Sequence, residues 1–284
     1  MGIGKGEMIR VENISYQYET SSDRILKDIS MEIQEGAHVG VIGPNGCGKT
    51  TFVRHLDGLL IPTTGDVWVD GMNTKDAADV QKIRQRVGMV FQNPDNQIIG
   101  MSVEEDVSFG PGNLGLPPRD IQKRVEKSLA AVGMAPYATR TPHTLSNGEK
   151  QLVAIAGVLA MEPRYIVLDE PTTYLDPLAR NRVLDVIRKL NQGGITIIHV
   201  THDMDDIAEA DHILLLNEGK IALKERPSEI FTRVEWLRTL GLGVPKVTEM
   251  MWRLQQRGVD VPTDILTMED ACRELAARIQ TQTG

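Results

Sequence analysis

The sequence predicts an α/β fold, in which helices cover a sheet of parallel strands, and two stretches carry this prediction. Residues 39–42 read as a short buried strand, and residues 51–56 read as a helix with Phe52, Leu56 and Leu59 on one side. Residues 165–168 form a continuous apolar run, which is typical of a parallel strand buried on both faces. Polar sequence follows each strand, where open α/β sheets place their ligand sites.

The glycine-rich loop after the first strand reads GPNGCGKT and fits the pattern G-x-x-x-x-G-K-[ST]. Glycines let backbone N–H groups curl around a polyphosphate, and the start of the following helix adds partial positive charge. Lys49 is placed to reach the β- and γ-phosphates, and the Thr50 hydroxyl can bind Mg²⁺. The alternative is a glycine-rich turn with an exposed lysine, which leaves the flanking strand and helix unexplained. The expected phosphate-binding residues are Asn45, Gly46, Cys47, Gly48, Lys49, Thr50 and Thr51.

Two acidic residues, Asp169 and Glu170, follow the apolar run and precede a proline. At that position Asp169 can hold Mg²⁺ through its water shell, and Glu170 can polarise an attacking water. Solvated surface charge is the usual explanation of an Asp-Glu pair, but it does not account for a pair directly after a buried strand. We therefore expect a hydrolytic site for a nucleotide with bound Mg²⁺.

A second candidate site lies at residues 145–149, LSNGE, which precede a strongly periodic helix with Leu152, Ile155, Ala156 and Leu159 on one stripe. Ser146 is a good N-cap, and a helix start that includes Gly148 is an anion site. From the residues alone, an ordinary helix cap is an equally open alternative.

Together these stretches resemble the ATP-binding-cassette (ABC) ATPases, and the resemblance runs from about residue 9 to about residue 224. Further matches are Gln92 in VFQNPDNQ, the D-loop-like Tyr174-Leu175-Asp176, and His202 after a strand at residues 195–200. The resemblance implies a P-loop ABC ATPase core in which two cassettes enclose each ATP. It implies that Ser146, Asn147, Gly148 and Glu149 face the partner's ATP, with Asp176 in the D-loop. It also implies that His202 contacts the γ-phosphate in cis, that Gln92 senses Mg²⁺ and water, and that Tyr18 stacks on adenine.

Some residues depart from the family pattern. Asn147, Glu149 and Leu152 stand where the family usually has Gly, Gln and Arg. Asn tolerates a left-handed backbone, so Asn147 is expected to fit. Leu152 either extends the apolar stripe or reflects a weakened composite site. In the phosphate loop, Lys49 and the helix start favour a Cys47 thiolate, and an inert small residue is the alternative.

Two longer segments, residues 88–117 and 241–262, look like the ATPase subunits of energy-coupling-factor transporters, the cobalt/nickel and vitamin importers of prokaryotes. This resemblance implies a peripheral subunit on the cytoplasmic side of the cell membrane. The implied partners are a second ATPase, in a homodimer or heterodimer, a transmembrane coupling protein and a substrate-binding membrane subunit. Residues 93–101 would then meet the membrane partner, and a solvent-exposed loop is the alternative.

The chain divides into four expected parts. Residues 1–7 are a flexible N-terminus, and residues 8–95 with 164–226 form the nucleotide-binding core, which includes an antiparallel β subdomain and a hairpin-like stretch at residues 66–71. Residues 96–163 form a helical signature subdomain. Residues 227–284 form a small C-terminal helical extension, too apolar for a linker, which is expected to pair two subunits. Truncation after Lys224 is therefore expected to leave ATP binding intact.

Composition narrows the remaining classes. The net charge of −8 and the lack of a Lys/Arg run argue against nucleic acid as a partner. No stretch approaches the ~18 apolar residues of a membrane span, and two cysteines fit a reducing cytosol. Three alternatives stay open: a weakly hydrolysing regulatory ABC subunit paired with an active paralogue, a soluble non-transport ABC ATPase, and an exporter ATPase.

Overall fold

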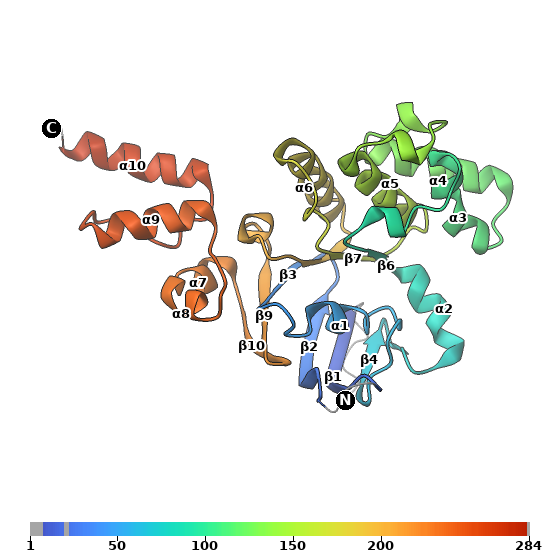
Figure 1. Cartoon of the computed structure of the whole chain (residues 1–284), viewed down its shortest axis with the longest axis horizontal. Coiled ribbons are helices and arrows are strands. Elements are labelled where there is room, and N and C mark those ends of the chain that lie inside the picture. The colour runs from blue at the N-terminus through green and yellow to red at the C-terminus, as the bar shows by residue number, and fades with distance from the viewer. Residues whose placement is uncertain (1–7, 20–22, 283–284) are drawn as a thin grey trace. The chain divides into compact units, whose positions relative to one another are not determined.

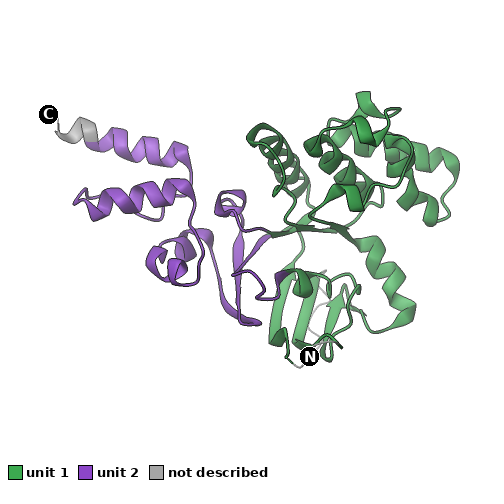
Figure 2. Cartoon of the chain, viewed as in Figure 1, with its two compact units in different colours: residues 1–38, 50–200 green, residues 39–49, 201–284 purple. Residues whose placement is uncertain are grey.

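The computed structural model describes residues 8–19 and 23–282, so the expectation for residues 1–7 lies outside the described part. The chain forms two compact units, residues 1–38 with 50–200 and residues 39–49 with 201–284 (Figure 2).

An antiparallel sheet forms the N-terminal part of the first unit (Figure 1). Its strands, in the order β2-β1-β4-β5, are β1 (Met8–Tyr16), β2 (Leu26–Gln34), β4 (Thr64–Val69) and β5 (Met72–Asn73). Asp70 and Gly71 connect β4 to β5 with φ of 48° and 80°, the left-handed backbone of a two-residue hairpin turn. The expected β subdomain and its hairpin are therefore confirmed.

Three parallel strands lie in the same unit: β6 (Val87–Val90), β7 (Tyr165–Asp169) and β8 (Thr196–Val200), with β7 between the other two. Every residue of β7 is buried, as the apolar run predicts for a strand covered on both faces. The strand ends on Asp169, so the paired acids lie at its carboxyl end, where the sequence places them.

Helices of the first unit surround a core that joins them to these strands. They are α2 (Ala77–Arg86), α3 (Val103–Asn113), α4 (Pro118–Ala131), α5 (Asn147–Leu159) and α6 (Pro177–Gln192), with short 3₁₀ turns η1 (Pro94–Asn96), η2 (Ala135–Tyr137) and η3 (Pro142–Thr144). The predicted stripe on α5 is buried, and Leu152 is 2 % exposed within that core. The structure therefore supports the packing explanation of Leu152.

The helix after the phosphate loop is shorter than predicted. α1 (Lys49–Val53) ends at Val53, and the next turns are tightened by bonds such as His55 N to Phe52 O at 3.1 Å. Phe52 and Leu56 are fully buried, but Leu59 is 45 % exposed. The prediction that Leu59 continues the apolar side was wrong, because the chain has left helical geometry before it.

The second unit contains β3 (His38–Ile42) from Val39 onward, η4 (Met204–Ile207), β9 (His212–Asn217) and β10 (Lys220–Glu225). β3 pairs with β9 in parallel, and β9 pairs with β10 through a turn at Glu218 and Gly219 with φ of 50° and 79°. The buried strand predicted at residues 39–42 is confirmed.

The C-terminal extension has two parts. α7 (Pro227–Phe231) and α8 (Val234–Thr239) bury Ile230, Phe231 and Leu237 against Ile213 and Leu215 of β9. α9 (Lys246–Gln256) and α10 (Met268–Gln282) share a separate small cluster around Met251 and Ala271. Truncation after Lys224 would therefore strip apolar residues from the β9 core, and a cut beyond Leu242 is better suited to testing the extension.

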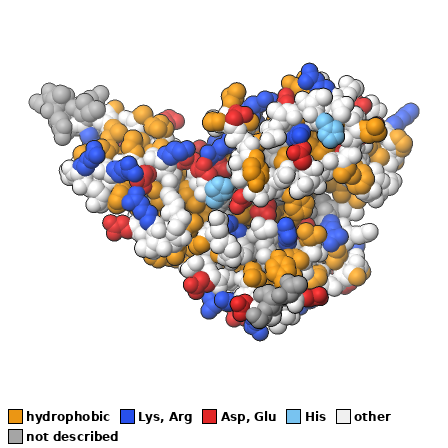
Figure 3. Space-filling model, viewed as in Figure 1, with side chains coloured by type: hydrophobic (Ala, Val, Ile, Leu, Met, Phe, Trp, Pro, Cys, Tyr) orange, Lys and Arg blue, Asp and Glu red, His pale blue; other side chains and the backbone are white. Residues whose placement is uncertain are grey.

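Within the described residues, the structure contains no helix with the length and apolar character needed to cross a lipid bilayer. On the face shown in Figure 3, acidic and basic side chains are interspersed.

Candidate functional site

The phosphate loop, up to Lys49, belongs to the second unit. Gly46 and Gly48 have φ of 78° and 105°, a backbone that a side chain would strain, so both glycines are needed for this turn. Lys49 is buried, and its Nζ donates to Gly43 O at 2.8 Å and to Pro44 O at 3.2 Å. Asn45 and Gly46 are exposed at the tip. The lysine is thus held against its own loop, in reach of whatever the loop encloses.

Cys47 lies inside this loop and is 7 % exposed. Burial raises the pKa of its thiol, and the lowering effect of Lys49 is smaller. Of the two alternatives for Cys47, this direction favours the inert small residue over the thiolate, because loss of water around the sulfur outweighs the nearby positive charge. Cys47 behaves as a small packed residue.

The next residue pair joins the start of α1 to the end of β7 in the first unit. The Thr50 hydroxyl donates to Asp169 Oδ1 at 3.1 Å, and Asp169 is only 5 % exposed. No group of three or more His, Cys, Asp or Glu side chains in the described residues could hold a metal by itself. Mg²⁺ usually takes one or two carboxylates together with waters and substrate phosphates. The hard oxygen donors Thr50 and Asp169 fit Mg²⁺ in that mode.

Glu170 is held in place by three contacts. Its backbone N–H donates to Val200 O at 2.9 Å, and its Oε2 accepts from Gln92 Nε2 at 2.9 Å and from the Thr173 hydroxyl at 3.1 Å. Its φ is 53°, an uncommon left-handed conformation for a non-glycine residue. Such conformations cluster at functional sites when the surroundings enforce them. The carboxylate is therefore aimed by its neighbours and not by chance rotation.

Tyr18 contacts the first turn of α1 through Thr51. Its hydroxyl is 3.1 Å from Thr51 Oγ1, and its ring meets that of Tyr16 edge-on, with centroids 4.9 Å apart. The structure thus ties the residue predicted to stack on adenine to a residue predicted to bind phosphate. The stacking role itself stays a prediction.

The LSNGE segment forms a capping box at the start of α5. Ser146 Oγ accepts from Glu149 N at 3.4 Å, and Glu149 Oε2 accepts from Ser146 N at 2.8 Å and from the Ser146 hydroxyl at 2.9 Å. The bond from the Ser146 N–H lowers the pKa of the Glu149 carboxyl. A negative charge therefore lies beside the serine that is expected to face the partner's ATP.

Packing explains the glycine of this segment. A Cβ on Gly148 would lie 2.5 Å from Ala179 Cβ on α6, which is too close for any side chain. α6 itself begins at Asp176, whose Oδ1 accepts from Leu178 N and Ala179 N at 2.9 Å. Asn147 is simply the first residue of α5 and has an ordinary helical backbone, so left-handed tolerance is not needed there.

His202 is exposed in the second unit, two residues beyond the end of β8. The turn around it is built by Thr201, whose N–H donates to Val41 O at 3.3 Å and whose Oγ1 accepts from Asp203 N at 3.0 Å. The γ-phosphate contact of His202 stays a prediction.

Sequence reasoning missed two contributors. Thr173 stands outside every motif that the sequence analysis used, yet its hydroxyl donates to Glu170. Ala179 carried no signal at all, because its role depends on how α6 packs on α5. The capping box was readable, since Ser-x-x-Glu before an apolar run is its signature.

Comparisons with known proteins fit this geometry. The family model of the ABC transporter matches residues 26–173. A cobalt import ATP-binding protein, CbiO of Syntrophus aciditrophicus, is 54% identical over 95% of this chain and 96% of its own length. The chain belongs to the ABC transporter family. An energy-coupling factor transporter ATP-binding protein, EcfA1 of Caldanaerobacter subterraneus, is 51% identical over 93% of this chain and 96% of its own.

Two solved ABC structures are similar as well. The structure of cbiO1 from Clostridium perfringens, part of the ABC transporter complex cbiONQ, has a TM-score of 0.76 and 35% identity over 89% of this chain and 100% of its own. The cassette MJ0796, a dimer in a post-hydrolysis state with ADP and Pi, has a TM-score of 0.69 and 30% identity over 77% and 98%. The chain is thus an ABC ATPase subunit of the energy-coupling-factor type, and the predicted fold class is confirmed.

Proposed function

We propose that this ABC subunit binds ATP with Mg²⁺ and that its hydrolysis drives import of a transition metal, such as cobalt, or of a vitamin. The observation that carries the proposal is the position of the Glu170 carboxylate. Gln92 holds this carboxylate by a hydrogen bond, and Glu170 directly follows Asp169, which is bonded to Thr50. A carboxylate held beside the oxygens of Thr50 and Asp169 supports the role of base for Glu170 and of Mg²⁺ ligands for the other two. The names of the CbiO and EcfA1 relatives support the importer class.

The residues divide the work as follows. Lys49 and the loop N–H groups hold phosphates, Thr50, Asp169 and Gln92 hold or sense Mg²⁺, and Glu170 orients water. Tyr18 stacks on adenine, and His202 contacts the γ-phosphate. Phosphoryl transfer to water is mostly positioning and charge stabilisation, so fixed side chains suffice for it.

A second cassette, identical or paralogous, completes each ATP site through its LSNGE segment. The solved dimer of MJ0796 supports this arrangement. The charged Glu149 beside Ser146 favours a weaker composite site on this side, because it places negative charge near an incoming phosphate. That observation keeps the alternative of a weakly hydrolysing subunit paired with an active paralogue.

The surface that meets the membrane partner, on the cytoplasmic side, is the segment 93–101 after Gln92. Ile99 and Met101 are 64% and 83% exposed there, and Phe109 on α3 is 55% exposed. Exposed large apolar side chains near one another mark interaction sites. A transmembrane coupling protein, bound to a substrate-binding subunit, is the proposed occupant.

This assignment predicts the outcome of co-purification from native membranes. Ile99→Asp with Met101→Asp should release the membrane subunits from the tagged chain, because each charge would enter an apolar interface. Ile61→Asp, at an apolar residue 44% exposed and outside every proposed interface, is the matched control and should retain them. Mass spectrometry identifies the bound subunits. If the wild-type chain, the double variant and the control variant all recover the membrane subunits equally, residues 93–101 are not part of the interface.

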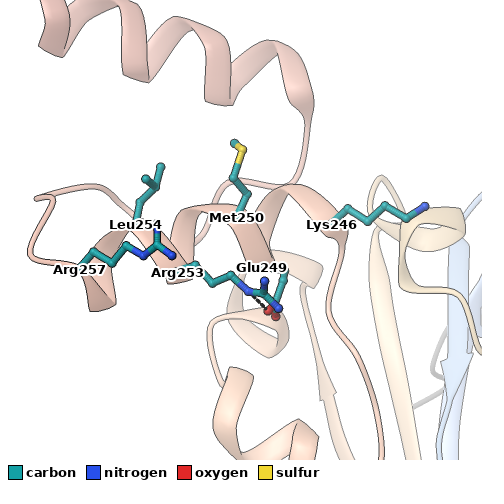
Figure 4. Close-up of a pocket in the computed structure, with 6 residues that line it drawn as sticks. All are labelled: Lys246, Glu249, Met250, Arg253, Leu254 and Arg257. Atoms are coloured by element: carbon teal, nitrogen blue, oxygen red, sulfur yellow. Dashed lines mark hydrogen bonds and ion pairs between the residues drawn. The ribbon is translucent and has the colours of Figure 1, made fainter.

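The second part of the extension, α9 and α10, is proposed to pair with its counterpart on the second ATPase. A groove of about 450 Å³ on α9 is lined by Lys246, Glu249, Met250, Arg253, Leu254 and Arg257 (Figure 4). Apolar Met250 and Leu254 lie on the side toward α10, and Arg253 Nε donates to Glu249 Oε1 at 2.6 Å at the opposite rim. An apolar strip with a charged rim fits the anatomy of a subunit interface.

A chain ending at Gly243 tests this pairing. It keeps every buried residue of the β9 core and loses only Val244 and Leu266 from its edge, so it should fold and bind ATP with near-normal affinity, yet it should be monomeric without nucleotide. Light scattering gives the oligomeric state. Arg257→Glu, which alters the groove without touching the cluster of α9 and α10, should weaken the dimer in the same direction. If both chains match the full-length protein, the extension does not hold the dimer.

A further inference from the structure

The segment that follows Gln92 is a fixed structure and not a loose loop. Asn93 caps η1 by accepting from Asp95 N at 3.0 Å, and Pro94 within it is buried. Gln97 closes the segment on β6, because its Oε1 accepts from Phe91 N and its Nε2 donates to Met89 O, both at 3.2 Å. Displacement of this segment would therefore also displace the backbone to which Gln97 is bonded, at Met89 and Phe91.

The exposed end is fixed as well. Asp106 Oδ1 on α3 accepts from Ile99 N at 2.8 Å and from Gly100 N at 2.9 Å. A Cβ on Gly100 would lie 2.5 Å from Asp106 N, so the segment packs directly on that helix turn. Ile99 is consequently held outward with its backbone bound.

One side chain joins this segment to α5. Lys150 Nζ lies 2.7 Å from Asp95 Oδ1, with the lysine side chain 13% exposed and the aspartate 56%. Lysine is rarely so covered without a partner. Lys150 directly follows Glu149, so the bond ends within the first turn of α5, next to the capping box of Ser146.

We infer that the Asp95–Lys150 ion pair is the positioning link through which the segment 93–101 sets the LSNGE turn. The inference rests on the proposed function, in which that segment meets the membrane partner and that turn faces the second ATP. Occupation of the segment by the partner shifts Asp95, and Lys150 moves the start of α5 with it. The Asp95 end of the pair is 56% exposed, where an ion pair contributes little to folding, so exchange of Asp95 leaves the fold in place.

The test uses ATP turnover of the membrane complex divided by that of the isolated chain. Asp95→Lys and Lys150→Asp should each move this ratio at least about threefold toward one, since residues that couple two sites act on that scale. The double charge swap should restore the ratio. The same swap at Asp79 and Lys82, an ion pair of 3.2 Å on α2, is the control and should leave it unchanged.

The failures are distinguishable. Single variants that keep the wild-type ratio, or a swap no better than the singles, overturn the link while the proposed function stands. A wild-type ratio of one overturns the proposed coupling to a membrane partner, and the link with it. Loss of membrane subunits from the single variants, checked by co-purification, would assign Asp95 and Lys150 to partner binding and overturn the link.

Discussion

Replacing Glu170 by Gln is expected to lower ATP turnover roughly 10²–10⁴-fold while ATP binding is retained, as is usual when a general base is removed. Gln keeps the shape of the side chain, and its oxygen can still accept from Gln92 and Thr173. What is lost is the negative charge that draws a proton from water. Turnover and nucleotide affinity, measured on the same preparation, separate the two effects.

A matched control comes from the backbone. Glu218 also has a left-handed φ, of 50°, but it lies in the β9–β10 turn. Glu218→Gln should hydrolyse ATP normally, which shows that the exchange is tolerated in this conformation. Wild-type turnover in the Glu170 variant would mean that another group activates the water.

Replacing Ser146 by Arg is expected to abolish ATP-driven closure of the cassette dimer while the isolated chain binds nucleotide normally. The arginine side chain would fill the space expected for the partner's ATP phosphate. Binding of the chain's own nucleotide should be unaffected, because its phosphate loop is a different segment, residues 43–50. Closure is measured as the size of the protein in the presence of ATP, with Glu170→Gln added to both chains so that hydrolysis is slow. Glu149→Gln is the control: it keeps an acceptor for Ser146, removes the charge, and should close at least as well.

An unchanged dimer in the Ser146 variant would remove LSNGE from the interface. Restoring the family pattern at position 152 is a poorer experiment, since Leu152→Arg would bury a charge in the core of α5.

The order of helices and strands could be predicted from the sequence, because local residue patterns determine each element. A buried strand, the glycine loop and a helix had to follow one another at residues 39–53, and the acids had to end β7. It did not carry the burial of Cys47 or the exposure of Leu59, since both depend on what packs nearby. The Gln92–Glu170 bond joins residues 78 apart and needed the fold to appear. The roles of these residues stay predictions until the variants are measured.

The contact between Gly148 and Ala179 has a consequence for anyone who redesigns this chain. The two positions lie on different helices, yet a side chain at position 148 would displace Ala179, so the residue allowed at the start of α5 depends on α6. If the LSNGE segment of another protein replaced this one without residues 176–179, the start of α5 would meet an α6 surface to which it is not fitted. In relatives that carry a side chain at position 148, we expect glycine at position 179.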